Sequence, residues 1–148
     1  MTTINKSIIV NAPIDRVWAA GTQQHRWTEW YVGLEEVTVT GGEANTPGQT
    51  WTGKFNLAGK IMLDFEGSLL EIEENKLYKT NTKGPIDSES TWTYEAHDDG
   101  TTTISANVEY ELSGAVLGKI ADKLFVERKT ASDLQETLES FKRILEAE

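Results

Sequence analysis

The sequence has 148 residues, 38% of them hydrophobic and 26% charged, which is ordinary for a globular protein with a core of its own. Its net charge of −10 argues against a nucleic-acid partner, because phosphate binding needs a basic surface. The chain has no cysteine, no apolar run near the roughly 20 residues of a membrane span and no signal-peptide pattern, so we expect one cytoplasmic domain over residues 1–148.

The first expected elements are a strand and two short helices. A strand-like run at residues 8–11 passes directly into a short helix over residues 12–18. Pro13 suits the first turn of that helix, where a backbone N–H has no partner to lose. We expect the second short helix over residues 23–31.

Six further strands are expected, at residues 34–40, 49–57, 60–73, 76–83, 88–97 and 101–112. Turn residues such as Gly41-Gly42 and Asp98-Asp99-Gly100 separate them, and the short connections predict antiparallel pairing of consecutive strands. Apolar and polar residues alternate along the strands, so each has one apolar face, and a single sheet packed on one side is indicated. The expected inward-facing residues of ligand-binding interest are Trp51, Phe55, Leu63, Phe65, Trp92, Tyr94, Val108 and Tyr110.

The chain is expected to end in one long amphipathic helix over residues 115–146. On a helical wheel its apolar stripe consists of Leu117, Ile120, Ala121, Leu124, Ala131, Leu134, Leu138, Phe141 and Leu145. A helix of about 30 residues is about 45 Å long, enough to cross a sheet. Because a strongly curved sheet cannot close fully on one straight helix, we expect an internal cavity between them.

Arg128 is the charge that lies closest to this stripe. It falls about 20° from Leu117 on the wheel, beside Ala121 and Leu124. A cation there is able to hold a carboxylate or an enolate through a bidentate fork; the alternative is an arginine at the edge of the stripe that extends into solvent. We place Leu117, Ala121, Leu124 and Arg128 with the strand residues on the expected ligand-binding wall.

Several segments resemble the START/Bet v 1-like (SRPBCC) superfamily, and within it the polyketide cyclase/dehydrase and lipid-transport group. They are Ile9-Val10-Asn11-Ala12-Pro13-Ile14-Asp15-Arg16-Val17-Trp18, Trp27-Thr28-Glu29-Trp30, Gly48-Gln49-Thr50-Trp51, and Leu112-Ser113-Gly114 before the last helix. The resemblance covers nearly the whole chain in element order, and its motifs are structural rather than catalytic.

The resemblance implies an α+β helix-grip fold. In this fold a seven-stranded curved antiparallel sheet surrounds a long C-terminal helix, two short helices follow the first strand, and an apolar ligand cavity lies between sheet and helix. Members of the superfamily bind lipids, sterols, polyketides, hormones or quinones; some are enzymes, and others act as chaperone cofactors.

Motifs for catalysis are scarce. His25 and His97 lack metal-ligand spacing and there is no cysteine, so we expect neither a metal nor a cofactor. No Gly-x-Ser-x-Gly, Gly-x-Gly-x-x-Gly or Walker sequence occurs, and Ser113 suits a helix cap better than a nucleophile. Catalytic residues therefore remain unidentified. Glycines within residues 112–118 permit either a movable flap over the cavity or simple fraying of the helix end.

Three functions remain open. The favoured one is a carrier or sensor that holds a small hydrophobic molecule, such as a lipid or polyketide, in the internal cavity. The second is a cofactor-free polyketide cyclase or dehydratase that uses Tyr94, Tyr110 or Arg128. The third is a protein-interaction module of the chaperone-activator type, with a filled core and an acidic sheet face within residues 61–100; a cavity below roughly 300 Å³ favours it. The oligomeric state is not indicated.

Overall fold

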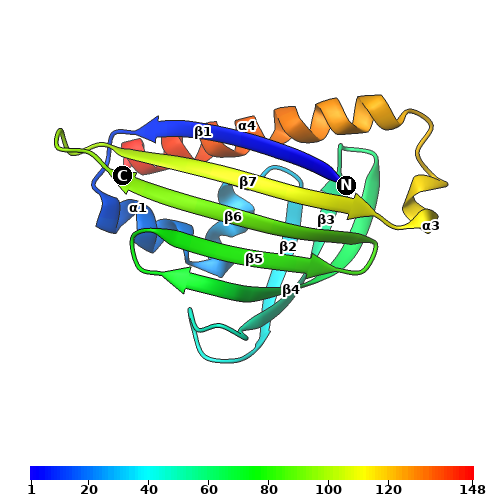
Figure 1. Ribbon diagram of the computed structural model, residues 1–148, viewed down its shortest axis with the longest axis horizontal. Coiled ribbons are helices and arrows are strands. Elements are labelled where there is room, and N and C mark those ends of the chain that lie inside the picture. Colours follow the sequence, from blue (N-terminus) through cyan, green and yellow to red (C-terminus); the bar gives the residue numbers. More distant parts are fainter.

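A computed structural model describes residues 1–148 as seven antiparallel strands and a long C-terminal helix (Figure 1). In chain order the elements are β1 (Thr2–Val10), α1 (Ile14–Gly21), the 3-10 helix η1 (Gln24–Arg26), α2 (Trp27–Trp30), β2 (Leu34–Gly41), β3 (Thr50–Leu57), β4 (Ile61–Glu73), β5 (Leu77–Lys83), β6 (Ile86–Ala96), β7 (Thr102–Leu112), α3 (Gly114–Leu117) and α4 (Lys123–Ala147). The strand order β1-β7-β6-β5-β4-β3-β2 is a meander whose last strand pairs with the first. The expected α+β helix-grip fold is confirmed.

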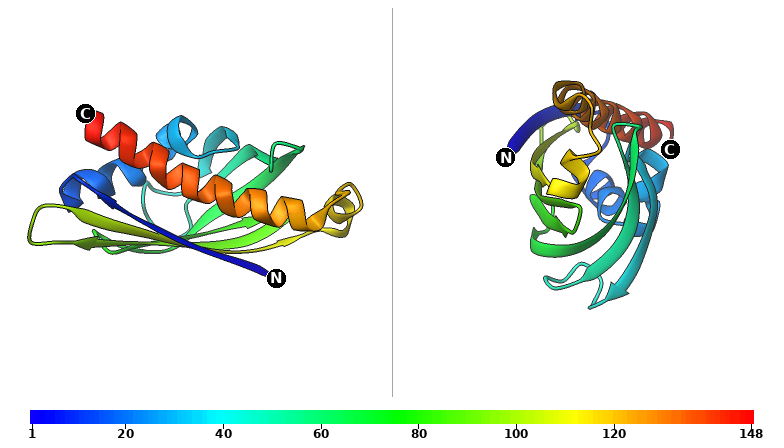
Figure 2. Two further views of the ribbon diagram at one scale, coloured as in Figure 1. Left: turned by 90° about the horizontal axis from the view of Figure 1, so that it is seen from above. Right: turned by 90° about the vertical axis from the view of Figure 1, so that its right-hand side faces the viewer.

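The sheet curls around the helices instead of lying flat beneath them. Seen from its end, it turns from β1 round to β2, and α4 lies across the open side (Figure 2). The helix packs on β1 and on α2, and α2 in turn packs on β2. The main core therefore lies between the inner face of the sheet and these helices, and its members include Trp18, Trp30, Trp92, Leu138 and Phe141. None of the helices is both long and apolar enough to cross a bilayer.

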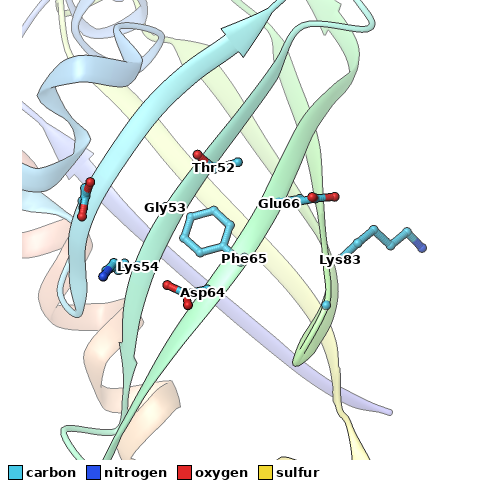
Figure 3. Close-up of a pocket in the computed structure, with 9 residues that line it drawn as sticks. Thr52, Gly53, Lys54, Asp64, Phe65, Glu66 and Lys83 are labelled. Carbon is cyan, nitrogen blue, oxygen red and sulfur yellow. The ribbon is translucent and has the colours of Figure 1, made fainter.

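Two glycine–aromatic pairs lie at the bend between β3 and β4. In the strand register Trp51 stands opposite Gly67, and Gly53 stands opposite Phe65. A Cβ added to Gly53 would lie 2.7 Å from Phe65 Cζ, and one added to Gly67 would overlap Trp51 Nε1. Each ring therefore covers the place of a missing side chain, and Figure 3 shows Phe65 beside Gly53. Glycine at these two positions permits the close approach that a strongly coiled strand pair needs.

The single helix expected over residues 115–146 is wrong, because the structure has two helices there. Ser113 Oγ accepts the backbone N–H of Val116 at 3.3 Å, which confirms Ser113 as the cap of α3. The second helix, α4, starts after Asp122, whose Oδ1 accepts the backbone N–H of Phe125 at 3.0 Å. Residues 118–122 between them are not helical, so one wheel drawn through the break misplaces the residues before Asp122.

The N-terminal strand is longer than expected. Its pairing with β7 runs from Thr2 opposite Tyr110 to Val10 opposite Thr102, whereas the sequence showed a strand-like run only at residues 8–11, with Lys6 on the same inner row. The early part, Thr2 to Ser7, is mostly polar because β1 is an edge strand, and only Ile4 is buried there. The ends of the other six strands differ from the expected ones by at most two residues.

The Gly67→Ala variant should unfold at clearly lower urea concentration than the wild type. The added methyl overlaps the Trp51 indole, and overpacking of this kind costs about 1–3 kcal/mol or more. Equilibrium urea unfolding, followed by tryptophan fluorescence, measures the difference.

The matched control is Gly114→Ala, because an added Cβ at Gly114 meets no atom within 4 Å. Its stability should stay within about 0.5 kcal/mol of the wild type. Equal stability of the two variants would contradict the role given to Gly67.

Candidate ligand-binding cavity

An internal cavity of about 150 Å³ lies between the inner face of the sheet and the short helices. Its apolar wall consists mainly of aromatic rings: Trp27 and Trp30 from α2, Trp51 and Phe55 from β3, Phe65 from β4 and Trp92 from β6. Trp27 meets Trp51 edge-to-face with ring centres 5.2 Å apart, which keeps this part of the wall tightly packed.

Seven of the twelve expected ligand-binding residues line this cavity: Trp51, Phe55, Phe65, Trp92, Tyr94, Val108 and Tyr110. Their contact with a ligand stays a prediction. Leu63 also points inward, but it packs in a separate core cluster with Leu57, Val116 and Val126 at the α3 end of the sheet. Because Val116 is the buried residue of α3, it joins that helix to the cluster; a moving flap at residues 112–118 stays a prediction.

The remaining four expected residues do not line the cavity. Leu117 and Leu124 are 41% and 54% exposed, and Ala121 and Arg128 are exposed as well. Leu117 belongs to α3 and Ala121 to the break, so neither continues the face of α4. Arg128 lies about 200° around α4 from the buried Val126, which directs it away from the sheet. The alternative of a solvent-exposed arginine is therefore the correct one.

Residues that sequence reasoning did not place on the wall complete it. Trp27, Trp30 and Tyr31 come from α2 and the residue after it, and Tyr78 comes from β5. A polar group comes from the sheet centre and from α4: Thr80, Thr82, Ser88, Ser90 and Thr130. In the register of β5 and β6, Thr80 faces Ser90 and Thr82 faces Ser88. The cavity thus has an aromatic part and a hydroxyl-rich part.

No charged side chain lines the cavity, but all four tyrosines of the chain do. Burial raises the pKa of Tyr31 and of Tyr78 to about 12. Burial also raises the pKa of Tyr94 and of Tyr110. At neutral pH these phenols are therefore uncharged and serve as hydrogen-bond donors and acceptors. His25 is exposed on η1 and is not part of the wall.

A buried amide network orients Tyr78. Gln24 Nε2 donates to Tyr78 Oη at 2.9 Å and to Gln49 Oε1 at 3.0 Å, and Gln49 Oε1 also accepts the backbone N–H of Asn45 at 3.0 Å. Because Tyr78 Oη accepts the amide hydrogen, the hydrogen of its own hydroxyl stays available to another acceptor. Edge contacts with Trp18 and Trp27, with ring centres 6.2 Å apart in both pairs, hold the ring in place.

A second depression, of about 530 Å³, opens on the outer face of β2, β3 and β4 (Figure 3). Phe65 is its single apolar residue, and charged side chains surround it: Glu36, Lys54, Asp64, Glu66 and Lys83. No ion pair joins these charges, and each of them is exposed. This depression is a charged solvent-facing surface, in contrast to the neutral internal cavity.

Comparisons with known proteins agree on the fold. A family model described as polyketide cyclase / dehydrase and lipid transport matches residues 1–146. No curated protein matches the sequence. The solved protein TTHA0849 from Thermus thermophilus shares 15% identity and a TM-score of 0.81, with 99% of this chain and 98% of that one covered.

Two further structures are similar. A START superfamily protein from Mycobacterium smegmatis has 10% identity, a TM-score of 0.80, and coverage of 98% of this chain and 97% of that one. The Zhui aromatase/cyclase from Streptomyces sp. R1128 has 13% identity, a TM-score of 0.77, and coverage of 98% and 93%. At such identities these likenesses establish the fold.

The buried tyrosines should resist ionisation. In the native protein the tyrosinate absorbance should stay low at pH 10, the ordinary tyrosine pKa, and rise toward pH 12, while the urea-unfolded chain ionises near pH 10. The folded pKa values are raised, so the unfolded state loses its protons first. Stability should therefore be fully present below pH 10 and fall as the pH rises toward 12.

The Tyr94→Phe variant removes one such buried phenol and should show a shallower fall in stability above pH 10. Urea unfolding at several pH values between 9 and 11 tests this slope. Ionisation of the native tyrosines with a midpoint near pH 10, as in the unfolded chain, would contradict the buried, neutral cavity.

Proposed function

The chain belongs to the polyketide cyclase/dehydrase and lipid-transport family, and from this premise we propose that it binds a small, uncharged, hydrophobic molecule in the internal cavity. Family and fold support a hydrophobic ligand-binding or polyketide cyclase-type role. Within that range we propose a carrier or sensor, in which binding alone is the function.

The observation that carries the proposal is a cavity wall that is mostly apolar and contains no charged group. A charged ligand would lose its hydration there without gaining a partner of opposite charge, which costs several kcal/mol or more. An uncharged ring, by contrast, meets the faces and edges of tryptophan and phenylalanine, which favour aromatic contact.

The size of the cavity sets the size of the ligand. About 150 Å³ accommodates one aromatic ring of the benzene class. This volume is below the roughly 300 Å³ at which ligand pockets commonly start, and a cavity smaller than that favours a protein-interaction module. The interaction module therefore remains the competing function, with the acidic outer face of the sheet as its docking surface, and occupancy of the cavity separates the two.

A cofactor-free cyclase is the second candidate from the same cavity. The observation that favours it is the available hydroxyl hydrogen of Tyr78, which is able to donate to a substrate carbonyl. Arg128 does not take part in this mechanism, because it is exposed on α4 and does not line the cavity. The raised pKa values leave the tyrosines protonated at neutral pH, so they are poor bases. We therefore favour simple ligand binding over catalysis.

Toluene should bind in the cavity. We expect saturable binding with a dissociation constant on the order of 0.1–1 mM, given the affinity that so few heavy atoms supply. Four of the five tryptophans line the cavity, so their fluorescence should change on titration, and the thermal midpoint should rise.

The Val108→Phe variant places a ring inside the cavity and should abolish this binding. The matched control is Thr93→Phe, which adds the same ring at an exposed position of β6. Failure of toluene to bind the wild type would favour the interaction module, and equal loss in both variants would point to general destabilisation.

A further inference from the structure

Two buried hydroxyl groups without hydrogen-bond partners lie in the wall of this cavity. In the whole protein four buried side-chain polar atoms lack a partner, and two of them are Tyr110 Oη and Thr130 Oγ1. Both residues line the cavity, Tyr110 from β7 and Thr130 from α4. Tyr110 is only 3% exposed, so bulk water does not reach its hydroxyl.

Such a pair is costly for the folded protein. Buried polar groups are almost always hydrogen-bonded, and leaving one unsatisfied costs about 1–3 kcal/mol. Phenylalanine and valine would fill the same shapes without this penalty. The hydroxyls of Thr130 and Thr2 lie near the Tyr110 hydroxyl and lower its pKa, while the charge of Glu127 raises it, but no hydrogen bond of ordinary geometry joins Tyr110 to these groups. The Tyr110 and Thr130 hydroxyls therefore retain unused capacity to donate and to accept.

Tyr110 lies in register with hydroxyl-bearing residues of the two neighbouring strands. Ser88 stands opposite Tyr110 in the pairing of β6 and β7, and Thr82 stands opposite Ser88 in the pairing of β5 and β6. Three neighbouring strands thus carry hydroxyl-bearing residues in one cross-strand row, with their backbones about 4.8 Å apart. Thr82 Oγ1 and Ser88 Oγ already bond each other at 2.6 Å, whereas Tyr110 and Thr130 do not have partners.

We propose that the cavity selects a neutral single-ring molecule that carries two oxygen substituents, a dihydroxy or keto–enol ring, and that Tyr110 and Thr130 bind those oxygens. This inference rests on the proposed function, because it assigns the ligand class of the same cavity. The carbon edge of the ring lies against the aromatic wall. Hydroxyls both donate and accept, so they serve a ketone or a hydroxyl equally, whereas the absence of a cation in the wall disfavours carboxylates.

Resorcinol and toluene are the two probes that test the proposal, by isothermal titration at pH 7. Water holds resorcinol far more strongly than toluene, so an entirely apolar site would prefer toluene. We expect the wild type to bind resorcinol at least tenfold more tightly than toluene. The Tyr110→Phe/Thr130→Val double variant should lose that preference while it keeps its affinity for toluene, because a missing partner leaves the ligand oxygen unpaired.

Thr93→Val is the control, since it removes a hydroxyl from the outer face of β6 and should leave both affinities unchanged. Urea unfolding of the double variant should show stability equal to or above that of the wild type, because two unsatisfied groups are gone.

If toluene binds and the wild type shows no preference for resorcinol, the oxygen-binding role is overturned while the cavity function survives. If the preference persists in the double variant, the two hydroxyls are not its source. If neither probe binds, the proposed function itself fails.

Discussion

The sheet of this protein is wider than a single helix can cover, and the rest of the structure depends on how that mismatch is resolved. Its inner face is largely apolar, yet α4 packs mainly against β1, at one edge of the sheet, and against α2. The glycines at positions 53 and 67 let β3 and β4 coil, so the far edge returns toward the helices. Large rings from α2 and the sheet occupy most of the enclosed space, and the part that they leave free is the cavity.

Charge is separated strictly between the two sides of this curled sheet. The chain carries a net charge of −10, and the outer faces of β2, β3 and β4 display acids and lysines to solvent. The cavity wall has phenols, hydroxyls and an amide but no ionised group at neutral pH. Under the proposed binding function, recognition inside would rest on shape, aromatic contact and neutral hydrogen bonds, since no ion pair is available. The acidic exterior contributes to solubility instead.

Sequence patterns predicted the fold and one third of the cavity wall, seven of its 21 lining residues. Alternation in β6 and β7 is strict, so Trp92, Tyr94 and Tyr110 could be assigned to the inner face before the structure was known. Leu117 and Ala121 were misplaced, because the wheel ran through the break before α4. Asp122 directly ahead of Lys123-Leu124-Phe125 has the residue type of a helix cap, and that pattern was the available sign of a new helix start.

The hydroxyl-rich part of the wall was not predicted, for a different reason. Thr80, Thr82, Ser88 and Ser90 follow the same two-residue period as the aromatic residues of their strands, but a search for apolar alternation treats small polar residues as outward. Only the pairing of β5 with β6 and of β6 with β7 shows that they form one surface with Tyr110.

Structural features that lower stability without an evident gain in the folded protein are expected mainly at functional sites. A free volume in the core and unsatisfied buried hydroxyls each lower stability, and here both occur at the same place in the fold. Simple substitutions, phenylalanine for Tyr110 and valine for Thr130, would remove the second cost without altering the packing. The proposed ligand would fill this free volume and satisfy both hydroxyls, so one bound molecule would offset both costs.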